Sequence, residues 1–249
     1  MDSGLCIQNL HLQVENQTVL ENFSLDVPKG EIHALMGPNG VGKSSLFKAI
    51  AGHPNYHVLR GDIYFNGISL RNRKPDDIAQ RGIFLAFQHP LEMEGLSVAN
   101  FIRAALQSRQ KAGEVFSSTD FYAQLYCCMD QLRIDHSFSS RSIHVGFSGG
   151  EKKRCEVLQM LMLRPRFALL DEIDSGLDVD ILQLMAKEIH KFQEENKMGG
   201  LVITHSARFL RHLRPDRVHV LLDGQIVRSG QEEIIGQIEH SGYRSFALS

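Results

Sequence analysis

One short stretch of the chain has the residue types and spacing needed to hold a polyphosphate. The pattern G-x-x-x-x-G-K-[ST] is matched by Gly37, Pro38, Asn39, Gly40, Val41, Gly42, Lys43 and Ser44. Glycines let such a loop wrap closely around phosphate oxygens, where a side chain would collide with the ligand. Lys43 adds a positive charge for the β- and γ-phosphates, and the Ser44 hydroxyl is a ligand for Mg²⁺. The stretch therefore predicts a phosphate-binding loop.

The segments on either side are those that such a loop requires. Residues 32–36 form a short apolar run typical of a buried strand, and residues 45–51 predict a helix that ends at Gly52. The first backbone N–H groups and the positive dipole end of this helix would face the anion, and we count Ser45 among the binding residues. Strand, loop and helix in this order favour a phosphate site over a structural glycine turn.

Two carboxylates follow a later apolar strand. Asp171 and Glu172 come directly after residues 167–170, which predict a buried strand. A phosphate-binding loop needs a partner carboxylate for Mg²⁺ and a group that orients the attacking water. We therefore expect Asp171 to hold the metal and Glu172 to polarise the water that attacks the γ-phosphate.

Four residues before a further predicted helix are suited to bind a second phosphate. They are Ser148, Gly149, Gly150 and Glu151, and the helix is expected over residues 152–163. On its own this sequence is a common turn. At a helix N-terminus, however, exposed backbone N–H groups and a hydroxyl can bind an anion.

The composition excludes several classes of function. Lys and Arg number 27 against 29 Asp and Glu, and a net charge of −2 gives no reason to expect nucleic acid as a partner. No stretch approaches 18 consecutive apolar residues and no secretory signal begins the chain, so we expect a cytoplasmic protein without direct membrane insertion. The cysteines lack zinc-ligand spacing and are expected to be reduced and buried, namely Cys6, Cys127, Cys128 and Cys155.

The sequence pattern predicts an α/β fold in a single domain over residues 1–249. Short alternating runs in residues 5–30 and a type I′ hairpin signal at Asn66 and Gly67 predict an antiparallel β subdomain beside the loop. Strands alternating with helices in the rest of the chain indicate a parallel core.

Between the two halves, strand signals become rare. Residues 92–165, approximately, predict a helical subdomain inserted in the core, with candidate helices over residues 98–110 and 121–132 and a loop over residues 137–142. The core then continues with strands at 167–170 and 201–204, a helix at 181–192, and a hairpin with its turn at Asp223 and Gly224.

In this order, the motifs resemble those of the ABC-type ATPases over almost the whole chain. The resemblance adds Gln88, His205 and the stretch at residues 175–178. It implies an ABC ATPase fold with a RecA-like core, which hydrolyses ATP with Mg²⁺. By this resemblance Gln88 is the Q-loop glutamine, which contacts Mg²⁺ or water, so the implied metal ligands are Ser44, Gln88 and Asp171. His205 resembles the switch histidine that contacts the γ-phosphate.

The resemblance also implies how two subunits would cooperate. Residues 148–151 correspond to the signature motif, written here F-S-G-G-E in place of L-S-G-G-Q. In this family the signature serine acts in trans on ATP bound by a second subunit, which implies a transient, ATP-dependent head-to-tail dimer. Asp178 resembles the D-loop aspartate that crosses between subunits. One departure is that residues 14–18 contain no aromatic residue to stack on adenine, so we expect loose base selectivity.

The surroundings of the motifs narrow the resemblance further. Isoleucine, not the proline usual in transport ATPases, follows Glu172, and residues 82–90 and 145–154 also look like SufC-type ATPases of the Suf iron–sulfur cluster assembly system. This implies partners of the SufB/SufD scaffold type, whose conformation the ATP cycle would change. One alternative is the ATP-binding subunit of an ABC transporter. Another is a regulatory module without turnover, which the presence of Glu172 and His205 disfavours.

Overall fold

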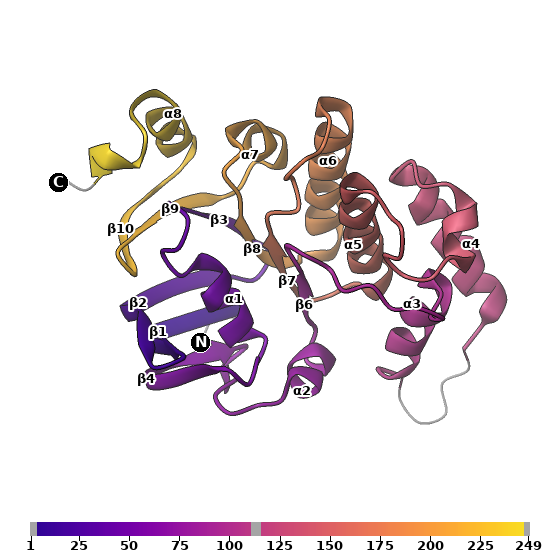
Figure 1. Ribbon diagram of the computed structural model, residues 1–249, viewed down its shortest axis with the longest axis horizontal. Helices are drawn as coiled ribbons and strands as arrows, with labels where there is room; N and C mark the ends of the chain where they lie inside the picture. The colour runs from indigo at the N-terminus through magenta and orange to yellow at the C-terminus, as the bar shows by residue number, and fades with distance from the viewer. Residues whose placement is uncertain (1–3, 111–115, 247–249) are drawn as a thin grey trace.

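The computed structural model describes residues 4–110 and 116–246, which form two β-sheets with helices between and around them (Figure 1). In chain order the elements are β1 (Gly4–Val14), β2 (Gln17–Pro28), β3 (Ile32–Met36), α1 (Lys43–Ile50), β4 (Tyr56–Phe65), β5 (Ile68–Ser69), α2 (Pro75–Gln80), β6 (Ile83–Ala86), α3 (Val98–Gln107), α4 (Ser118–Gln131), the 3₁₀-helix η1 (His136–Ser140), α5 (Gly149–Leu163), β7 (Phe167–Asp171), α6 (Val179–Asn196), β8 (Gly199–Ile203), α7 (Ala207–Leu213), β9 (Arg217–Leu222), β10 (Gln225–Gly230), α8 (Glu232–Ser241) and the 3₁₀-helix η2 (Tyr243–Phe246).

The central sheet brings the candidate residues to one edge. Its strand order is β10-β9-β3-β8-β7-β6, and all pairs are parallel except β10 with β9. Strands β3, β7 and β8 are buried at every position, as expected for parallel strands covered on both faces. The carboxyl ends of β3, β7 and β8 lead into the phosphate-binding loop, the carboxylates and His205, and such ends are where α/β sheets bind ligands.

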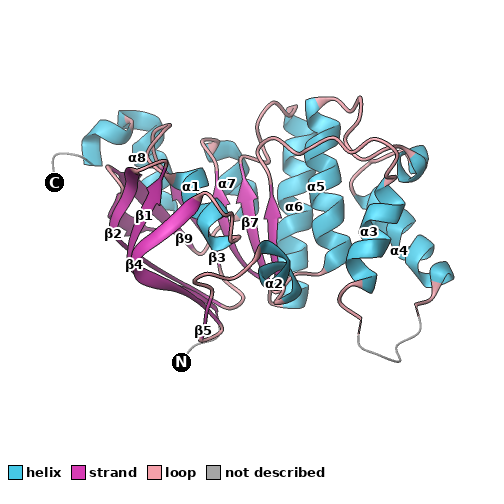
Figure 2. Cartoon of the chain, turned by 60° about the horizontal axis from the view of Figure 1, so that its bottom comes forward, coloured by secondary structure: helices cyan, strands magenta, loops and turns pink. Residues whose placement is uncertain are grey.

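The second sheet confirms the predicted antiparallel β subdomain. Its order is β2-β1-β4-β5, with every pair antiparallel. The turn at Asn66 and Gly67 has φ of 49° and 76°, which are the two positive values of a type I′ hairpin. Helix α1 lies between the two sheets, and its Leu46, Phe47 and Ile50 share one buried apolar cluster with both (Figure 2).

The other face of the central sheet is covered by α5, α6, α7 and α8, which share a second apolar cluster with it (Figure 1). Helix α6 buries Leu182, Met185, Ala186, Ile189 and Phe192 at helical spacing. The predicted helix at 181–192 is therefore confirmed, and the observed helix is longer at both ends.

The described part of residues 92–165 is mostly helical, with differences in detail. Helix α3 ends at Gln107, and α4 begins at Ser118 because the Ser117 side chain accepts a hydrogen bond from the Asp120 backbone and caps it. The stretch predicted as a loop at residues 137–142 is largely the 3₁₀-helix η1. The only extended pairing among its described residues is an isolated bridge between Ser97 and Ser142.

The expectation of four buried cysteines was wrong in part. Cys128 and Cys155 are buried, but Cys127 lies on the exposed side of α4 and Cys6 is half-buried. The reason is local, since adjacent positions of a helix cannot face the same side. Among the described residues, no helix is long and apolar enough to span a membrane.

Candidate nucleotide-binding site

Close packing explains the glycines of the phosphate-binding loop. Gly42 has a φ of 102°, and a Cβ there would lie 2.9 Å from the Val19 carbonyl oxygen of β2. At Gly37 a Cβ would lie 2.3 Å from the Leu221 carbonyl oxygen of β9. Gly40 has a φ of 83° and no atom within 4 Å of its Cβ position, so this part of the loop is open toward a ligand. Strands β2 and β9 therefore leave no room for a side chain at Gly42 and Gly37.

The start of α1 is suited to an anion. Its N-cap Gly42 offers no side-chain hydrogen bond, and no acidic residue lies in the first turn, so the first N–H groups and the dipole face the loop without competition. Lys43 is buried, and its Nζ donates hydrogen bonds of 2.8 Å to the carbonyls of Gly37 and Pro38. Burial lowers the pKa of Lys43, and the carboxylates of Glu172 and Asp171 oppose this shift.

Two predicted metal ligands meet directly. The Ser44 hydroxyl donates a hydrogen bond of 3.2 Å to Oδ1 of Asp171 at the end of β7. Neighbouring ligands of an octahedral Mg²⁺ lie about 3 Å apart, and Mg²⁺ commonly takes one or two protein oxygens besides phosphates and water. Burial raises the pKa of Asp171, and the Ser44 hydrogen bond opposes that shift. This pair of hard oxygen donors fits Mg²⁺.

Glu172 lies at the centre of the remaining side chains. Its Oε2 accepts a hydrogen bond of 2.6 Å from Nε2 of Gln88, and its Oε1 lies 3.6 Å from Nε2 of His205. Its φ of 46° lies in the left-handed region, which is strained for a residue with a side chain. Such strain is typical of functional positions. The third predicted metal ligand, Gln88, thus contacts Glu172 and not the pair of Ser44 and Asp171.

One pocket joins these groups. It is lined by Asn39, Gly40, Gly42, Lys43, Ser44, Ser45, Gln88 and Glu172. His205 reaches Glu172 from the end of β8, and burial lowers its pKa, with a further contribution from Lys43. Most of the predicted site residues are therefore brought together around one open space.

The signature residues do not line this pocket. Ser148 caps α5 by accepting a hydrogen bond of 3.3 Å from the Glu151 backbone, and the Glu151 carboxylate accepts one of 2.7 Å from the Ser148 backbone. This reciprocal arrangement is a capping box. A Cβ at Gly150 would lie 3.4 Å from the side chain of Leu177, and Asp178 caps α6. The signature and D-loop residues thus form a second group at the exposed starts of two helices.

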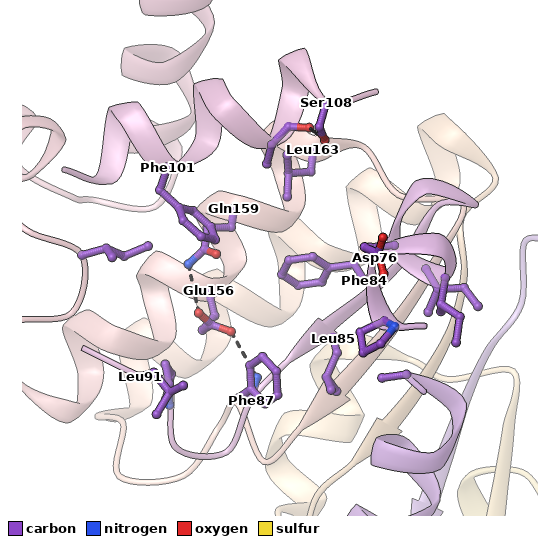
Figure 3. Close-up of a pocket in the computed structure, with 18 of the residues that line it drawn as sticks. Asp76, Phe84, Leu85, Phe87, Leu91, Phe101, Ser108, Glu156, Gln159 and Leu163 are labelled. Atoms are coloured by element: carbon purple, nitrogen blue, oxygen red, sulfur yellow. Dashed lines mark hydrogen bonds between the residues drawn. The ribbon is translucent and has the colours of Figure 1, made fainter. Parts of the chain in front are cut away.

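Two residues that the sequence analysis did not assign join the Q-loop to α5. Nζ of Lys153 donates a hydrogen bond of 2.6 Å to the Gln88 carbonyl. Oε2 of Glu156 accepts one of 3.1 Å from the Phe87 backbone (Figure 3). Lys153 and Glu156 lie three positions apart and so occupy one face of the helix. The sequence alone could not assign them a role, because it does not show that the Q-loop packs against this face.

A mainly apolar groove lies beside this junction. Its wall includes Phe84, Phe101 and Leu163, with Glu156 and Gln159 at its polar side (Figure 3). At its mouth Phe87 is 48% exposed and Leu91 is 76% exposed. Large apolar side chains that are this exposed around one groove are typical of a binding surface.

A third unassigned residue comes from the end of the described chain. The phenol of Tyr243 lies 3.4 Å from Nδ1 of His205, on the opposite side of the ring from Glu172. No sequence motif surrounds Tyr243, so only the fold could bring it to this site.

Comparison with known proteins supports the same assignment. A model of the ABC transporter family matches residues 20–175, more than half of the chain. Vegetative protein 296 of Bacillus subtilis is 44% identical over 241 residues, which cover 97% of this chain and 92% of that protein. A probable ABC transporter ATP-binding protein of Streptococcus pyogenes is 43% identical over 245 residues, covering 98% and 95%. A probable ATP-dependent transporter of Pyropia yezoensis is 44% identical over 239 residues, covering 95% of each chain.

Solved structures share the fold. A dimeric bacterial ABC transporter cassette matches with a TM-score of 0.79 at 20% identity, covering 92% of this chain and 98% of its own. An ATP-binding subunit of an ABC transporter matches with a TM-score of 0.79 at 25% identity, covering 99% and 98%. With the family match, this confirms the predicted ABC ATPase fold. The chain therefore belongs to the ABC transporter family, as an ATPase that uses ATP and Mg²⁺.

Proposed function

We propose that the chain is a SufC-type ATPase, whose ATP cycle changes the conformation of a SufB/SufD-type scaffold during iron–sulfur cluster assembly. The proposal rests on the sequence around the Q-loop, the signature and Glu172, which resembles that subfamily. It is also supported by the link between the nucleotide pocket and the apolar groove, since a motor that works on protein partners needs such a link.

We assign the following roles within the pocket. The loop residues 37–45 bind the phosphates, and Lys43 supplies a positive charge in a buried setting where charge is effective. Ser44 and Asp171 hold Mg²⁺, which neutralises phosphate charge. Glu172 accepts a hydrogen bond from the attacking water and polarises it, while Gln88 and His205 orient the Glu172 carboxylate and contact the water and the γ-phosphate.

We further propose that hydrolysis takes place in a head-to-tail dimer. Residues 148–151 lie outside the pocket of their own subunit; Ser148 and Gly149 are exposed, and Gly150 and Glu151 are half-buried, so this helix start can meet ATP held by a second copy. The side-chain oxygen of Ser148 accepts a hydrogen bond within the capping box, but its hydroxyl hydrogen can still be donated to a phosphate oxygen. Asp178, at the neighbouring helix start, would lie in the same interface.

The observation that carries the proposal is the double attachment of Gln88. Its side chain binds Glu172 while its backbone carbonyl is held by Lys153 of α5. One residue earlier, Phe87 is held by Glu156 of the same helix and exposes its ring at the groove. A scaffold helix seated in the groove would therefore move the same short segment that orients the catalytic carboxylate.

A second candidate is the ATP-binding subunit of an ABC transporter. It is favoured by the names of the relatives in Streptococcus pyogenes and Pyropia yezoensis. The same groove would then receive a segment of a membrane subunit, and the output would be movement of a substrate across a bilayer.

Affinity purification of the tagged chain from its own cells separates the two candidates. Mass spectrometry should find SufB/SufD-type scaffold proteins in stoichiometric amounts. A Phe87→Asp variant, which puts a charge at the mouth of the groove, should lose them, whereas Val227→Asp, at an exposed apolar residue of β10 outside the groove, serves as a control. Recovery of a polytopic membrane protein instead would overturn the Suf proposal and support the transporter reading.

A further inference from the structure

The C-terminal part of the chain reaches back to the nucleotide site through Tyr243. Its phenol oxygen lies 3.4 Å from Nδ1 of His205, and the backbone of Gly37, the first residue of the phosphate-binding loop, is a further polar neighbour of the phenol. Tyr243 thus connects the two segments that follow β3 and β8, neighbouring strands of the central sheet. Neither contact is with a residue close to it in the sequence.

The position of Tyr243 is fixed by packing on both sides. Before it, α8 buries Ile234 and Ile235 in the main apolar cluster and ends at Gly242, which has a φ of 65°. After it, Phe246 is buried in the same cluster. The Tyr243 ring itself packs against this cluster. The phenol is therefore presented to His205 by an anchored segment.

The contact with Tyr243 bears on which nitrogen of His205 carries hydrogen. Burial and the neighbouring Lys43 lower the pKa of His205, while Glu172 opposes the shift, so the ring is neutral near pH 7 and has a single N–H. Burial raises the pKa of Tyr243, although the neighbouring Gly37 backbone opposes the shift, so the phenol keeps its hydrogen near pH 7. The phenol hydrogen is then available to Nδ1.

When Nδ1 accepts this hydrogen bond, the ring hydrogen must sit on Nε2. Nε2 is the atom that lies 3.6 Å from Oε1 of Glu172, on the side of the nucleotide pocket. The opposite tautomer would present a lone pair to a carboxylate and to any phosphate oxygen, and both contacts would be repulsive.

We propose that Tyr243 is a positioning residue for ATP hydrolysis, which holds His205 in the tautomer that points an Nε2–H group at Glu172 and the γ-phosphate. The proposal rests on the role assigned to His205 above. It makes the C-terminal segment a structural part of the nucleotide site, although it follows every motif in the chain.

Steady-state kinetics test the effect on turnover. Tyr243→Phe keeps the ring and removes only the hydroxyl, and it should lower kcat about tenfold while KM for ATP changes less than about twofold, because the lost interaction acts in the transition state. Tyr64→Phe removes a hydroxyl from β4, outside the site, and should leave both values unchanged. His205→Ala should lower kcat at least as far as Tyr243→Phe does, and combining the two substitutions should lower it no further.

Nitrogen-15 NMR of histidine-labelled protein tests the tautomer directly, with the His205 signals identified by their loss in His205→Ala. The wild type should show hydrogen on Nε2, and Tyr243→Phe should shift the signals toward a mixture of tautomers. Hydrogen on Nδ1 in the wild type, or an unchanged spectrum in Tyr243→Phe, would overturn the proposal. If His205→Ala keeps full turnover, the role of His205 falls, and the NMR result still decides whether Tyr243 sets its tautomer.

Discussion

The side chain of Gln88 donates a hydrogen bond of 2.6 Å to the carboxylate of Glu172, so the Q-loop and the end of β7 meet at the proposed catalytic group. The backbone of Gln88 is held by Lys153 of α5. A shift of this helix against the central sheet would therefore displace Gln88 and, with it, the carboxylate of Glu172. The capping box at the start of α5 belongs to the signature motif. One helix thus connects the pocket, the groove and the proposed dimer interface.

Replacing Glu172 with Gln should separate ATP binding from hydrolysis. The amide keeps the size of the side chain but cannot accept a proton, so kcat should fall by about 10² or more while ATP still binds. With ATP and Mg²⁺, light scattering should detect a trapped dimer. Glu195→Gln, at an exposed position of α6, is the matched control. Hydrolysis at the wild-type rate in Glu172→Gln would show that Glu172 does not orient the water.

Replacing Lys43 with Ala should weaken nucleotide binding itself. The substitution removes a buried cation and leaves the carbonyls of Gly37 and Pro38 without their donor. Hydrogen bonds to a charged group contribute about 1.5–3 kcal/mol, so affinity for ATP should fall about 10- to 100-fold, as measured by calorimetry. Lys187→Ala on the exposed side of α6 should bind ATP normally. Unchanged affinity in Lys43→Ala would remove the phosphate-binding interpretation.

A buried histidine pair should make the fold sensitive to acid. His219 accepts or donates hydrogen bonds of 2.7 Å with Ser229 and 3.0 Å with His33, and both rings are buried. Burial, with His33 and Arg217 nearby, lowers the pKa of His219 from 6.5 to about 4. Between these values only the unfolded chain binds the proton, so the free energy of unfolding decreases as pH falls from 6.5 toward 4.

Urea unfolding at pH 7.5 and pH 5 measures this effect. The pKa shift of His219 corresponds to a loss of about 2 kcal/mol at pH 5, and His219→Gln should lose that much less than the wild type between the two conditions. His57→Gln, at an exposed histidine of β4, should behave as the wild type does. An equal loss in His219→Gln and wild type would show that His219 titrates normally in the folded protein.

The missing adenine platform should relax base selectivity. Strand β1 ends at Val14 and β2 begins at Gln17, and residues 14–18 bring no aromatic ring to the pocket. Stacking of a base on an aromatic side chain contributes about 1–3 kcal/mol, and this term is absent for every base here. We expect kcat/KM for GTP to lie within about tenfold of the value for ATP. A preference for ATP of several hundredfold would mean that another group recognises adenine.

Turn chemistry and hydrophobic patterns predicted those parts of the fold that depend on neighbouring residues in the sequence. The hairpins at Asn66 and Asp223 follow from turn chemistry, and the buried strands around the loop follow from their apolar runs. Helices α2, α7 and α8 and strand β6 were not predicted, because they are ten residues or shorter and their stability comes from packing against the sheet. The ends of α3 and α4 depend on serine caps whose geometry a sequence pattern does not contain.

The residues of the candidate site also fall into two groups, those that sequence motifs assigned and those that only the fold brings to the site. Motif spacing assigned the residues of the loop and the carboxylates, which chemistry constrains at fixed intervals. Lys153, Glu156 and Tyr243 act on partners 65, 69 and 38 residues away in the chain, and no local pattern records such contacts. The resemblance implied that Gln88 contacts Mg²⁺ or water, and the structure adds the contact of its amide with Glu172. Side-chain direction at the end of a strand is a result of folding.

ATP turnover with and without a purified SufB/SufD-type scaffold shows whether this ATPase works on that scaffold. We expect slow hydrolysis by the chain alone and a stimulation of about tenfold or more by the scaffold, since the closed dimer has to be assembled around ordered catalytic groups. Phe87→Asp should abolish the stimulation and keep the slow basal rate. Fast turnover without partners, or no change on adding the scaffold, would show that the scaffold does not control this ATPase.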